Sequence, residues 1–134
     1  MIVTETTGAG RAASHTKEEV QWTCLARRGM LFSECEAVDY LELAPRAAVT
    51  MRGRCGTEEV WYVLAGHADF ADPAAELPQR IGLGHLALRS AGTSATVRNP
   101  SSHTPSRLLL IAILPPAVSD RLPRRRPSID RGLR

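Results

Sequence analysis

The stretch that decides the fold is Thr57–Ala71, which reads TEEVWYVLAGHADFA. Side chains alternate across a β-strand, so this run has two distinct faces. One face carries Glu59, Trp61 and Val63, and the other carries Val60, Tyr62 and Leu64. Both faces hold large apolar side chains typical of strands, so we expect the strand to be covered on both sides. The Ala65-Gly66-His67 segment predicts a hairpin connection to a second strand.

Glu59 is the one acid within this apolar run. An unpaired buried charge costs considerable free energy, so a carboxylate at this position should be paired, bound to a ligand or lining a cavity. We expect the chain to form a small barrel around the hairpin, with Glu59 pointing into the barrel mouth.

Turn signals divide the rest of the chain into short strand-like segments. The segments expected as strands are 20–25, 31–43, 47–54, 76–81, 86–88, 93–98 and 107–114. A turn is expected at 27–30 and a short helical turn at 117–121. Many short strands and almost no helix indicate an all-β sandwich or barrel.

Length and composition favour one globular domain. The chain has 134 residues, 43% of them hydrophobic, which suffices for a core. No apolar run approaches the roughly 20 residues that span a bilayer, and the start lacks the apolar segment of a signal peptide. The three cysteines, Cys24, Cys35 and Cys55, follow no disulfide pattern. We therefore expect a cytoplasmic protein with no membrane partner.

The net charge of +3 comes from the C-terminal end. Residues 121–134 contain six Arg and one Asp, giving +5, so the remainder sums to −2. A basic surface over the folded body is not indicated, and nucleic acid is not expected as a partner. The predicted organisation is a flexible arm over 1–18, a barrel over 19–118 and a basic disordered tail over 119–134.

Two spacings resemble the motifs of the cupin superfamily. The first motif, G(X)5HXH(X)3-4E(X)6G, places its acid on Glu59 and its last glycine on Gly66. Its first glycine and two histidines then fall on Arg46, Arg52 and Arg54. The resemblance implies a cupin-type jelly-roll β-barrel covering about residues 35–115.

The second cupin motif, G(X)5PXG(X)2H(X)3N, fits with every gap retained. Its five positions fall on Gly84, Ser90, Gly92, Ala95 and Asn99. Two of five positions match in the first motif and three of five in the second. The resemblance also implies a homodimer.

The departures from the motifs concern the metal ligands. Cupins that bind a metal use the two histidines and the acid of the first motif and the histidine of the second. The matching positions here are Arg52, Arg54, Glu59 and Ala95. One carboxylate is a poor site for Fe, Mn, Ni or Zn, and guanidinium groups do not deprotonate to become ligands. We therefore predict no metal cofactor.

The altered site suggests acid–base chemistry on a small organic substrate. If Arg52 and Arg54 point inward, one can pair with Glu59 while the other binds a carboxylate or a developing oxyanion. The catalytic candidates are then Glu59, Arg52 and Arg54. Both arginines, together with Trp61 and Ala95, are the candidates for contacting the substrate. The resemblance points to a metal-independent cyclase or isomerase acting on a carbonyl- or carboxylate-bearing molecule in specialised metabolism.

Two other interpretations remain open. Glu59 can be held in a structural ion pair that replaces the metal, leaving a non-catalytic binding pocket. A metal can also be retained through displaced ligands, for which the candidates are His67, His85, His103 and Cys55. These histidines fall in turns and loops, where solvated side chains are common. Nucleotide-binding and serine-hydrolase motifs are absent from the sequence.

Overall fold

The computed structural model describes residues 20–28, 34–52 and 56–121, apart from the side chains of residues 51 and 52. The expected arm, all but the first residues of the expected tail, Arg54 and Cys55 lie outside the described residues.

The described residues form nine strands and one short helix, as the alternating sequence pattern predicts. The strands are β1 (Val20–Arg27), β2 (Cys35–Leu43), β3 (Ala48–Arg52), β4 (Glu58–Ala65), β5 (His67–Ala71), β6 (Gln79–Gly82), β7 (Leu86–Arg89), β8 (Ser94–Arg98) and β9 (Ser106–Ile113). The helix α1 (Pro116–Ser119) follows β9. The turn expected at 27–30 begins one residue late, because Arg27 still pairs with Ala37 in the β1–β2 ladder.

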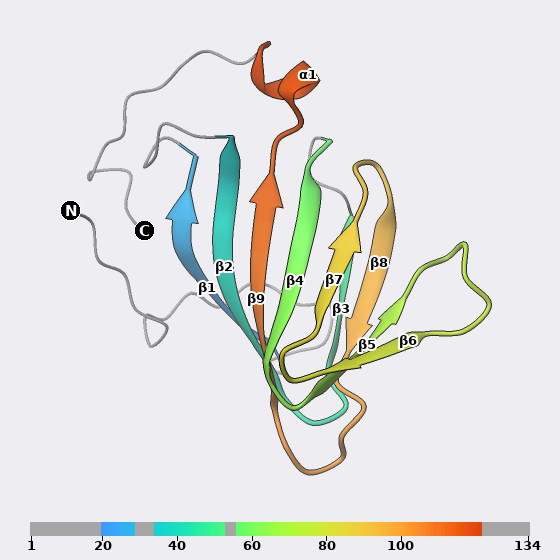
Figure 1. The fold of residues 1–134 in the computed structure, drawn as a ribbon. Coiled ribbons are helices and arrows are strands. Elements are labelled where there is room, and N and C mark those ends of the chain that lie inside the picture. The colour runs from blue at the N-terminus through green and yellow to red at the C-terminus, as the bar shows by residue number, and fades with distance from the viewer. Residues whose placement is uncertain (1–19, 29–33, 53–55, 122–134) are drawn as a thin grey trace.

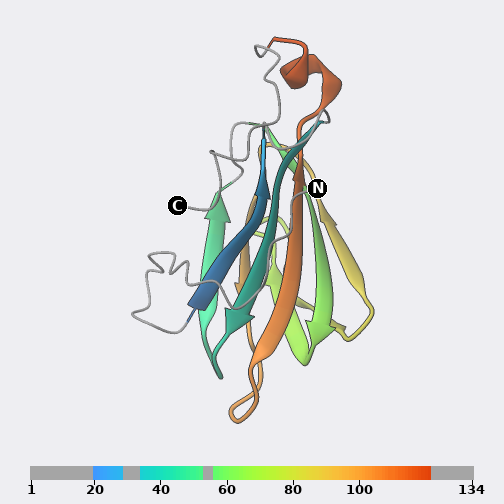
Figure 2. The ribbon, with the colours of Figure 1, turned by 90° about the vertical axis from the view of Figure 1, so that its left-hand side faces the viewer.

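Two antiparallel sheets make up the fold. One has the strand order β1-β2-β9-β4-β7 and the other β3-β8-β5-β6. Neighbours distant in sequence, such as β4 and β9, pair directly. Figures 1 and 2 show most strands of the two sheets running along one long axis, with α1 at one end, whereas the β5–β6 hairpin points away from that axis in Figure 1. This is the all-β jelly-roll arrangement that the sequence predicts.

Residues of both sheets form one core between them. The five-stranded sheet contributes Leu41, Trp61, Val63 and Leu108, and the four-stranded sheet contributes Ala68, Ile81 and Val97. Each strand contributes alternate residues, because successive side chains point to opposite faces. Burying this apolar surface is the main stabilising contribution to the fold.

The Ala65-Gly66-His67 segment is a corner between the two sheets, so the expected hairpin is wrong. β4 lies in the five-stranded sheet and β5 in the four-stranded sheet. Gly66 has φ 74°, and a Cβ at this position would lie 3.0 Å from the backbone oxygen of Pro105. Only glycine fits that conformation and that close approach without strain. The local sequence signals a turn but does not tell whether the flanking strands pair.

The outer face of β4 also differs from expectation. The inward residues Glu59 and Trp61 are buried, but Tyr62 and Leu64 on the outer face remain 36% and 39% exposed in the chain. The prediction that β4 is covered on both sides is therefore wrong for the single chain. The apolar outer face continues onto β7 through Leu86 and Leu88, which are also exposed.

Asn99 stabilises the end of the molecule opposite α1. Its Nδ2 donates to the backbone oxygens of Leu43, Ala44 and Thr104 at 2.8–3.1 Å, and its Oδ1 accepts from the backbone N–H of Ser101 at 2.9 Å. The side chain is fully buried, so it satisfies backbone groups that water does not reach. The last position of the second motif is therefore structural in this chain.

Arg46 adopts the left-handed conformation, with φ 66°. It occupies the position where the first cupin motif has glycine, the residue that takes this conformation without steric cost. Arg46 thus has the backbone conformation that a glycine at this motif position would favour. The motif glycines Gly66, Gly84 and Gly92 also have positive φ, as expected of turn glycines.

Candidate functional site: a pocket beside the Glu59–Arg89 ion pair

Glu59 is held by a two-point ion pair with Arg89. Nε of Arg89 donates to Oε2 of Glu59 at 2.9 Å, and Nη2 lies 2.5 Å from Oε1. Nε1 of Trp61 donates to the same Oε2 at 3.0 Å. The side chains of Glu59 and Arg89 are 1% and 8% exposed. Both carboxylate oxygens are therefore engaged by protein groups, away from water.

The register of the sheet creates this contact. Glu59 lies directly opposite Arg89 in the antiparallel β4–β7 ladder, where opposite residues project from the same face. Trp61 lies two residues along β4 and therefore shares the inner face with Glu59. Strand pairing and alternation are sufficient to bring the three side chains together.

Arg89 is fixed on its other side by Thr93. Its Nη1 donates to the backbone oxygen of Thr93 and lies 3.4 Å from the Thr93 hydroxyl. That hydroxyl donates in turn to the backbone oxygen of Ser90 at 2.8 Å. The turn between β7 and β8 therefore orients the guanidinium group toward Glu59.

A pocket of about 450 Å³ opens beside this ion pair, between β7 and the β5–β6 hairpin. Its apolar lining includes Trp61, Phe70, Leu77, Ile81, Ala87 and Ala95. Its polar lining consists of Asp72, Gln79, Arg89, Thr93 and Ser94. The volume falls in the range of small-molecule sites, which combine apolar walls with a few polar groups.

Two aromatic rings from different sheets meet in this pocket. Trp61 of β4 and Phe70 of β5 pack edge to face, with ring centroids 5.7 Å apart and planes at 74°. Such pairs stabilise by roughly 0.5–1.5 kcal/mol beyond the area that they bury. The hairpin that carries Phe70 extends beyond the sheets to the loop at 72–78 (Figure 1).

One ion pair joins the two strands of that hairpin. Arg80 on β6 donates to both carboxylate oxygens of Asp69 on β5, at 2.7 and 2.9 Å. These hydrogen bonds hold the pKa of the Asp69 carboxyl below its ordinary value, although partial burial opposes the shift. In the β5–β6 ladder this pair lies directly next to the pocket residues Phe70 and Gln79, which are opposite each other.

The predicted site residues are only partly brought together. Trp61 and Ala95 line the pocket, and Glu59 lies directly behind its Arg89 wall. Arg52 ends β3, with its backbone in register with Ser94, while Met51 is in register with Ala95. The side chain of Arg52 and the whole of Arg54 lie outside the described residues, so their catalytic roles stay predictions.

The cation that pairs with Glu59 was missed in the sequence. Arg89 occupies no position in either motif and lies immediately before the Ser90 position. The signal that identifies it is strand register, which a single sequence does not reveal. The expectation that Glu59 needs a partner is confirmed, with Arg89 as that partner.

The described residues do not fit the metal centre typical of this fold. Both oxygens of Glu59 are engaged by Arg89 and Trp61, and Ala95 offers no donor atom. Within 20–28, 34–52 and 56–121, no three His, Cys, Asp or Glu side chains gather in an arrangement suited to a metal ion.

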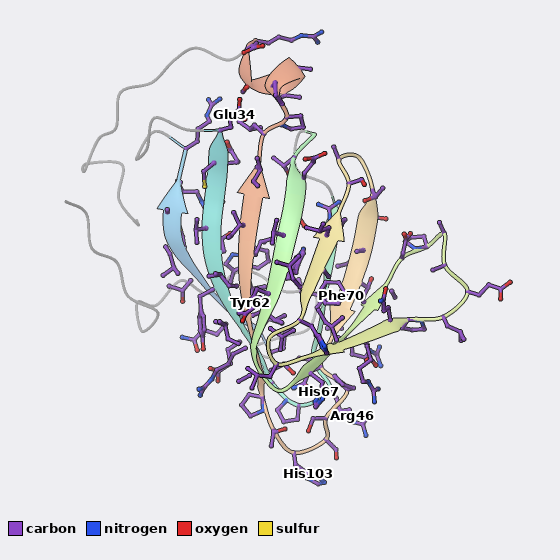
Figure 3. All side chains as sticks on the ribbon, viewed as in Figure 1. Glu34, Arg46, Tyr62, His67, Phe70 and His103 are labelled. Atoms are coloured by element: carbon purple, nitrogen blue, oxygen red, sulfur yellow. The ribbon has the colours of Figure 1, made fainter. Side chains whose placement is uncertain are left out.

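The histidines proposed as displaced ligands lie at the far end of β4 from Glu59. His67 begins β5, and His85 accepts a hydrogen bond at Nδ1 from the backbone N–H of Gly82 at 2.9 Å. His103 is exposed in the loop before β9. Figure 3 shows His67, His103 and Arg46 at the end of the molecule opposite α1. These histidines therefore do not complete a site with Glu59.

We searched the described part of the chain for a helix that could cross a membrane and found none. Its single helix, α1, is a short segment, and no helix there has the length and apolarity required to cross a bilayer.

Several solved structures are similar to this one. A protein from Thermotoga maritima described as a predicted oxalate decarboxylase matches with a TM-score of 0.72 and 21% identity, over 86% of this chain and 100% of that one. The Cupin_2 domain of an XRE family transcriptional regulator from Enterobacter cloacae matches with a TM-score of 0.64 and 14% identity, over 73% and 99%. A cupin superfamily protein from Desulfitobacterium hafniense matches with a TM-score of 0.58 and 12% identity, over 78% and 84%.

No protein-family model matches the sequence, and no curated protein does. At the identities of these structural matches, the likeness establishes the architecture and carries no activity.

Proposed function

We propose that this chain, whose fold is similar to that of solved cupin structures, binds a small organic molecule in the Trp61–Arg89 pocket without a metal ion at Glu59. The observation that carries the proposal is the ion pair itself. Arg89 and Trp61 supply the contacts to Glu59 that a metal ion makes in metal-binding cupins. A pocket of about 450 Å³ with an apolar lining remains beside the pair.

A metal-independent enzyme of the cyclase or isomerase type is the second candidate. It is favoured by the position of Arg89, whose guanidinium lines the pocket and lies next to a carboxylate. A fixed cation beside a developing oxyanion lowers the barrier to enolisation, and a carboxylate can accept the proton. Because both oxygens of Glu59 already accept hydrogen bonds or pair with Arg89, a catalytic Glu59 has to exchange one of these contacts during turnover.

The similar structures do not separate the two candidates. They include a protein described as a predicted decarboxylase and a domain of a transcriptional regulator. Binding therefore has to be measured independently of turnover.

The test uses the full-length protein with Trp22→Phe, which leaves Trp61 as the only tryptophan. A panel of small ketones, acids, amines and alcohols is screened by thermal shift and by Trp61 fluorescence, with mass spectrometry of each incubated mixture. Elemental analysis of the same preparation measures bound metal. Binding with unchanged ligand supports the first candidate, and a product lost in Glu59→Gln supports the second. A stoichiometric transition metal retained by wild type and lost in Glu59→Gln contradicts both.

A further inference from the structure

We infer that the pocket takes a short extended peptide, which adds to the outer edge of β7 as a further strand of the five-stranded sheet. The inference rests on the proposed function and names the chemical class of the ligand. Three features support it: the backbone groups that β7 leaves unpaired, the walls of the groove beside β7 and the apolar side chains that line this groove.

β7 is an edge strand whose whole length faces the pocket. It ends the strand order β1-β2-β9-β4-β7, so β4 is its one partner among the described strands. All four of its residues, Leu86–Arg89, line the pocket. Successive side chains of a strand point to opposite faces, so a wall made of consecutive residues is formed by the edge of the strand and not by one of its faces.

The pairing with β4 determines which backbone groups of β7 point to the pocket. The backbone N–H of Val63 on β4 donates to the oxygen of His85 at 3.1 Å, and the ladder continues from there into β7 without a register shift. In an antiparallel pair, residues that exchange hydrogen bonds alternate with residues that do not. Ala87 therefore directs its backbone groups to β4, whereas Leu86 and Leu88 direct theirs away from β4, toward the pocket.

These backbone groups of Leu86 and Leu88 are accessible. Within 20–28, 34–52 and 56–121 no backbone group outside β4 pairs with them. The two residues are 51% and 76% exposed. Unpaired N–H and C=O groups at a sheet edge attract another strand, and natural edges often carry charged side chains that prevent this. β7 reads Leu-Ala-Leu before its final Arg, so its first three residues lack that protection.

The opposite wall of the groove is the edge of the other sheet. β6 ends the strand order β3-β8-β5-β6, and its residues Gln79 and Ile81 line the pocket. A tight turn joins β6 to β7, with the backbone N–H of His85 donating to the oxygen of Gly82 at 2.9 Å. Beyond this turn the two strands belong to different sheets, and no pairing between them occurs in the described part of the chain. The pocket thus lies where the two sheets leave their edges unjoined.

The groove fits a single strand. An added strand would lie about 4.8 Å from β7. Beyond it, β6 and the loop at 72–78, which contributes the lining residue Leu77, close the far side of a volume of about 450 Å³. The edge of a second folded sheet would meet this wall, whereas a peptide of three residues, about 10 Å long, matches the segment Leu86–Leu88. A short peptide is therefore the occupant that the groove favours.

Alternation along the added strand predicts which side chains the peptide carries. Its residue opposite Ala87 projects to the inner face, where Trp61 and Phe70 pack edge to face. Ala87 is small, so a large side chain has room opposite it. The residues on either side project to the outer face beside Leu86 and Leu88. We therefore expect an aromatic or large apolar residue at the centre, flanked by β-branched apolar residues that favour strands.

The first experiment separates backbone pairing from simple filling of an apolar pocket. The probe is acetyl-Ser-Val-Phe-Val-Ser-amide, and its binding to the full-length protein is measured by calorimetry. One derivative carries an N-methyl group on both Val residues and the other carries it on Phe. The described strand pairs of this fold are antiparallel, and in that arrangement the Val residues opposite Leu86 and Leu88 exchange hydrogen bonds with β7, whereas Phe does not.

We expect N-methylation of the Val residues to weaken binding by at least about ten-fold, because it removes donors to β7 and places bulk at the strand edge. N-methylation of Phe should change the affinity by less than about three-fold, because that N–H points away from β7. The Phe derivative is therefore the matched control, with the same added methyl group and the same side chains.

A substitution removes one of these hydrogen bonds from the protein side. Leu88→Pro eliminates an N–H that points away from β4, a position at which edge strands tolerate proline. Leu88→Ala is the control, because it also removes the leucine side chain and keeps the N–H. We expect Leu88→Pro to bind the parent peptide at least about five-fold more weakly than Leu88→Ala. Thermal melts establish that both variants are folded.

Amide hydrogen exchange followed by NMR gives a readout on the unmodified protein. The N–H groups of Leu86 and Leu88 should exchange at least about ten-fold more slowly with the parent peptide bound, because they become hydrogen-bonded. The N–H of Ala87, which already pairs with β4, should change much less. Equal slowing of all three would contradict the assignment of the free edge.

The outcomes distinguish this inference from the proposed function. Equal affinity for the parent peptide and both derivatives overturns strand addition, and a loss confined to the Phe derivative overturns the antiparallel direction. A dimer that Leu88→Pro dissociates and Leu88→Ala does not shows a second copy at this edge, and overturns the peptide as occupant. If the peptide fails to bind while a small molecule of the earlier panel binds, the inference is wrong and the proposed function stands. If neither binds, both are wrong.

Discussion

Arg89 lies directly opposite Glu59 in the β4–β7 ladder, and the two side chains form a buried two-point ion pair. Glu59 is the residue that falls on the acid position of the cupin motif that the sequence resembles. A buried ion pair is not automatically stabilising, because removing two charges from water can cost as much as their attraction returns. In this structure the ion pair orients side chains, because it holds Arg89 at the wall of the pocket and keeps Trp61 in contact with Glu59.

The first prediction concerns the stability of this pair. Arg89→Met leaves the Glu59 carboxylate buried beside an apolar group, so we expect it to lower the free energy of unfolding by about 3–5 kcal/mol. The double variant Glu59→Leu with Arg89→Met removes both charges and should recover most of that loss. Urea denaturation of wild type, Glu59→Leu, Arg89→Met and the double variant gives the coupling energy. Additive losses in the double variant contradict the pairing.

A matched control comes from the exposed pair Glu42–Arg107, whose charged atoms lie 3.1 Å apart on the outer face of the five-stranded sheet. The corresponding Glu42→Leu and Arg107→Met variants should each change the free energy of unfolding by less than about 1 kcal/mol, since exposed pairs contribute little.

The second prediction concerns the left-handed residue Arg46. Arg46→Gly removes the steric cost of a Cβ at φ 66°, so we expect the free energy of unfolding to rise by about 1 kcal/mol. Arg98→Gly in the exposed part of β8 is the control. It should destabilise by a similar amount, because glycine in an extended strand only adds freedom to the unfolded chain. Thermal melts of both variants provide the measurement, and a lower melting temperature for Arg46→Gly contradicts the prediction.

The third prediction is a pH dependence at the β5–β6 hairpin. The hydrogen bonds from Arg80 hold the pKa of Asp69 below its ordinary value. The stability that this pair contributes is therefore present above the ordinary carboxyl range and is lost as the pH falls through the lowered pKa of folded Asp69. We expect Arg80→Gln to be less stable than wild type at neutral pH and equally stable in acid.

Thermal melts of wild type and Arg80→Gln from about pH 7 down to about pH 2.5 test this, since the window runs from well above the ordinary carboxyl pKa to below it. Arg107→Gln serves as a control for general charge effects. A difference between wild type and Arg80→Gln that stays constant across the range shows that Asp69 is not the titrating group.

The fourth prediction concerns oligomeric state, which the resemblance to cupins suggests is dimeric. Tyr62 and Leu64 on β4 and Leu86 on β7 expose apolar surface on the outer face of one sheet. We expect two copies to pack through this face, because monomers rarely expose contiguous apolar patches of this kind. Light scattering after size exclusion should give a dimer for wild type and a monomer for Tyr62→Lys with Leu64→Lys. Leu83→Lys is the control, and a monomeric wild type at micromolar concentration refutes the prediction.

Local sequence signals were sufficient to predict the strands. Alternation placed Glu59 and Trp61 on one face, and this proved enough to anticipate that Glu59 needs a partner. The motif spacing also located Arg46, whose left-handed backbone is the conformation that the glycine of that motif position would favour. These properties depend on the residue and its near neighbours along the chain.

The remaining features depend on contacts between distant segments. Arg89 lies 30 residues from Glu59 in sequence and meets it only through strand register. The corner at Gly66 looks like a hairpin in sequence, because a turn residue carries no information about which strands pair beyond it. The pocket depends on the strand register and on the corner, since β7 supplies Arg89 and the chain beyond Gly66 supplies Phe70.

The corner at Gly66 fixes how the two aromatic rings of the pocket meet. Trp61 precedes the corner on one sheet and Phe70 follows it on the other, and their rings pack edge to face. One backbone bend therefore sets the contact between two pocket residues that belong to different sheets. A lineage that altered this bend, or the Pro105 backbone packed against it, would reshape the pocket while leaving every lining residue in place.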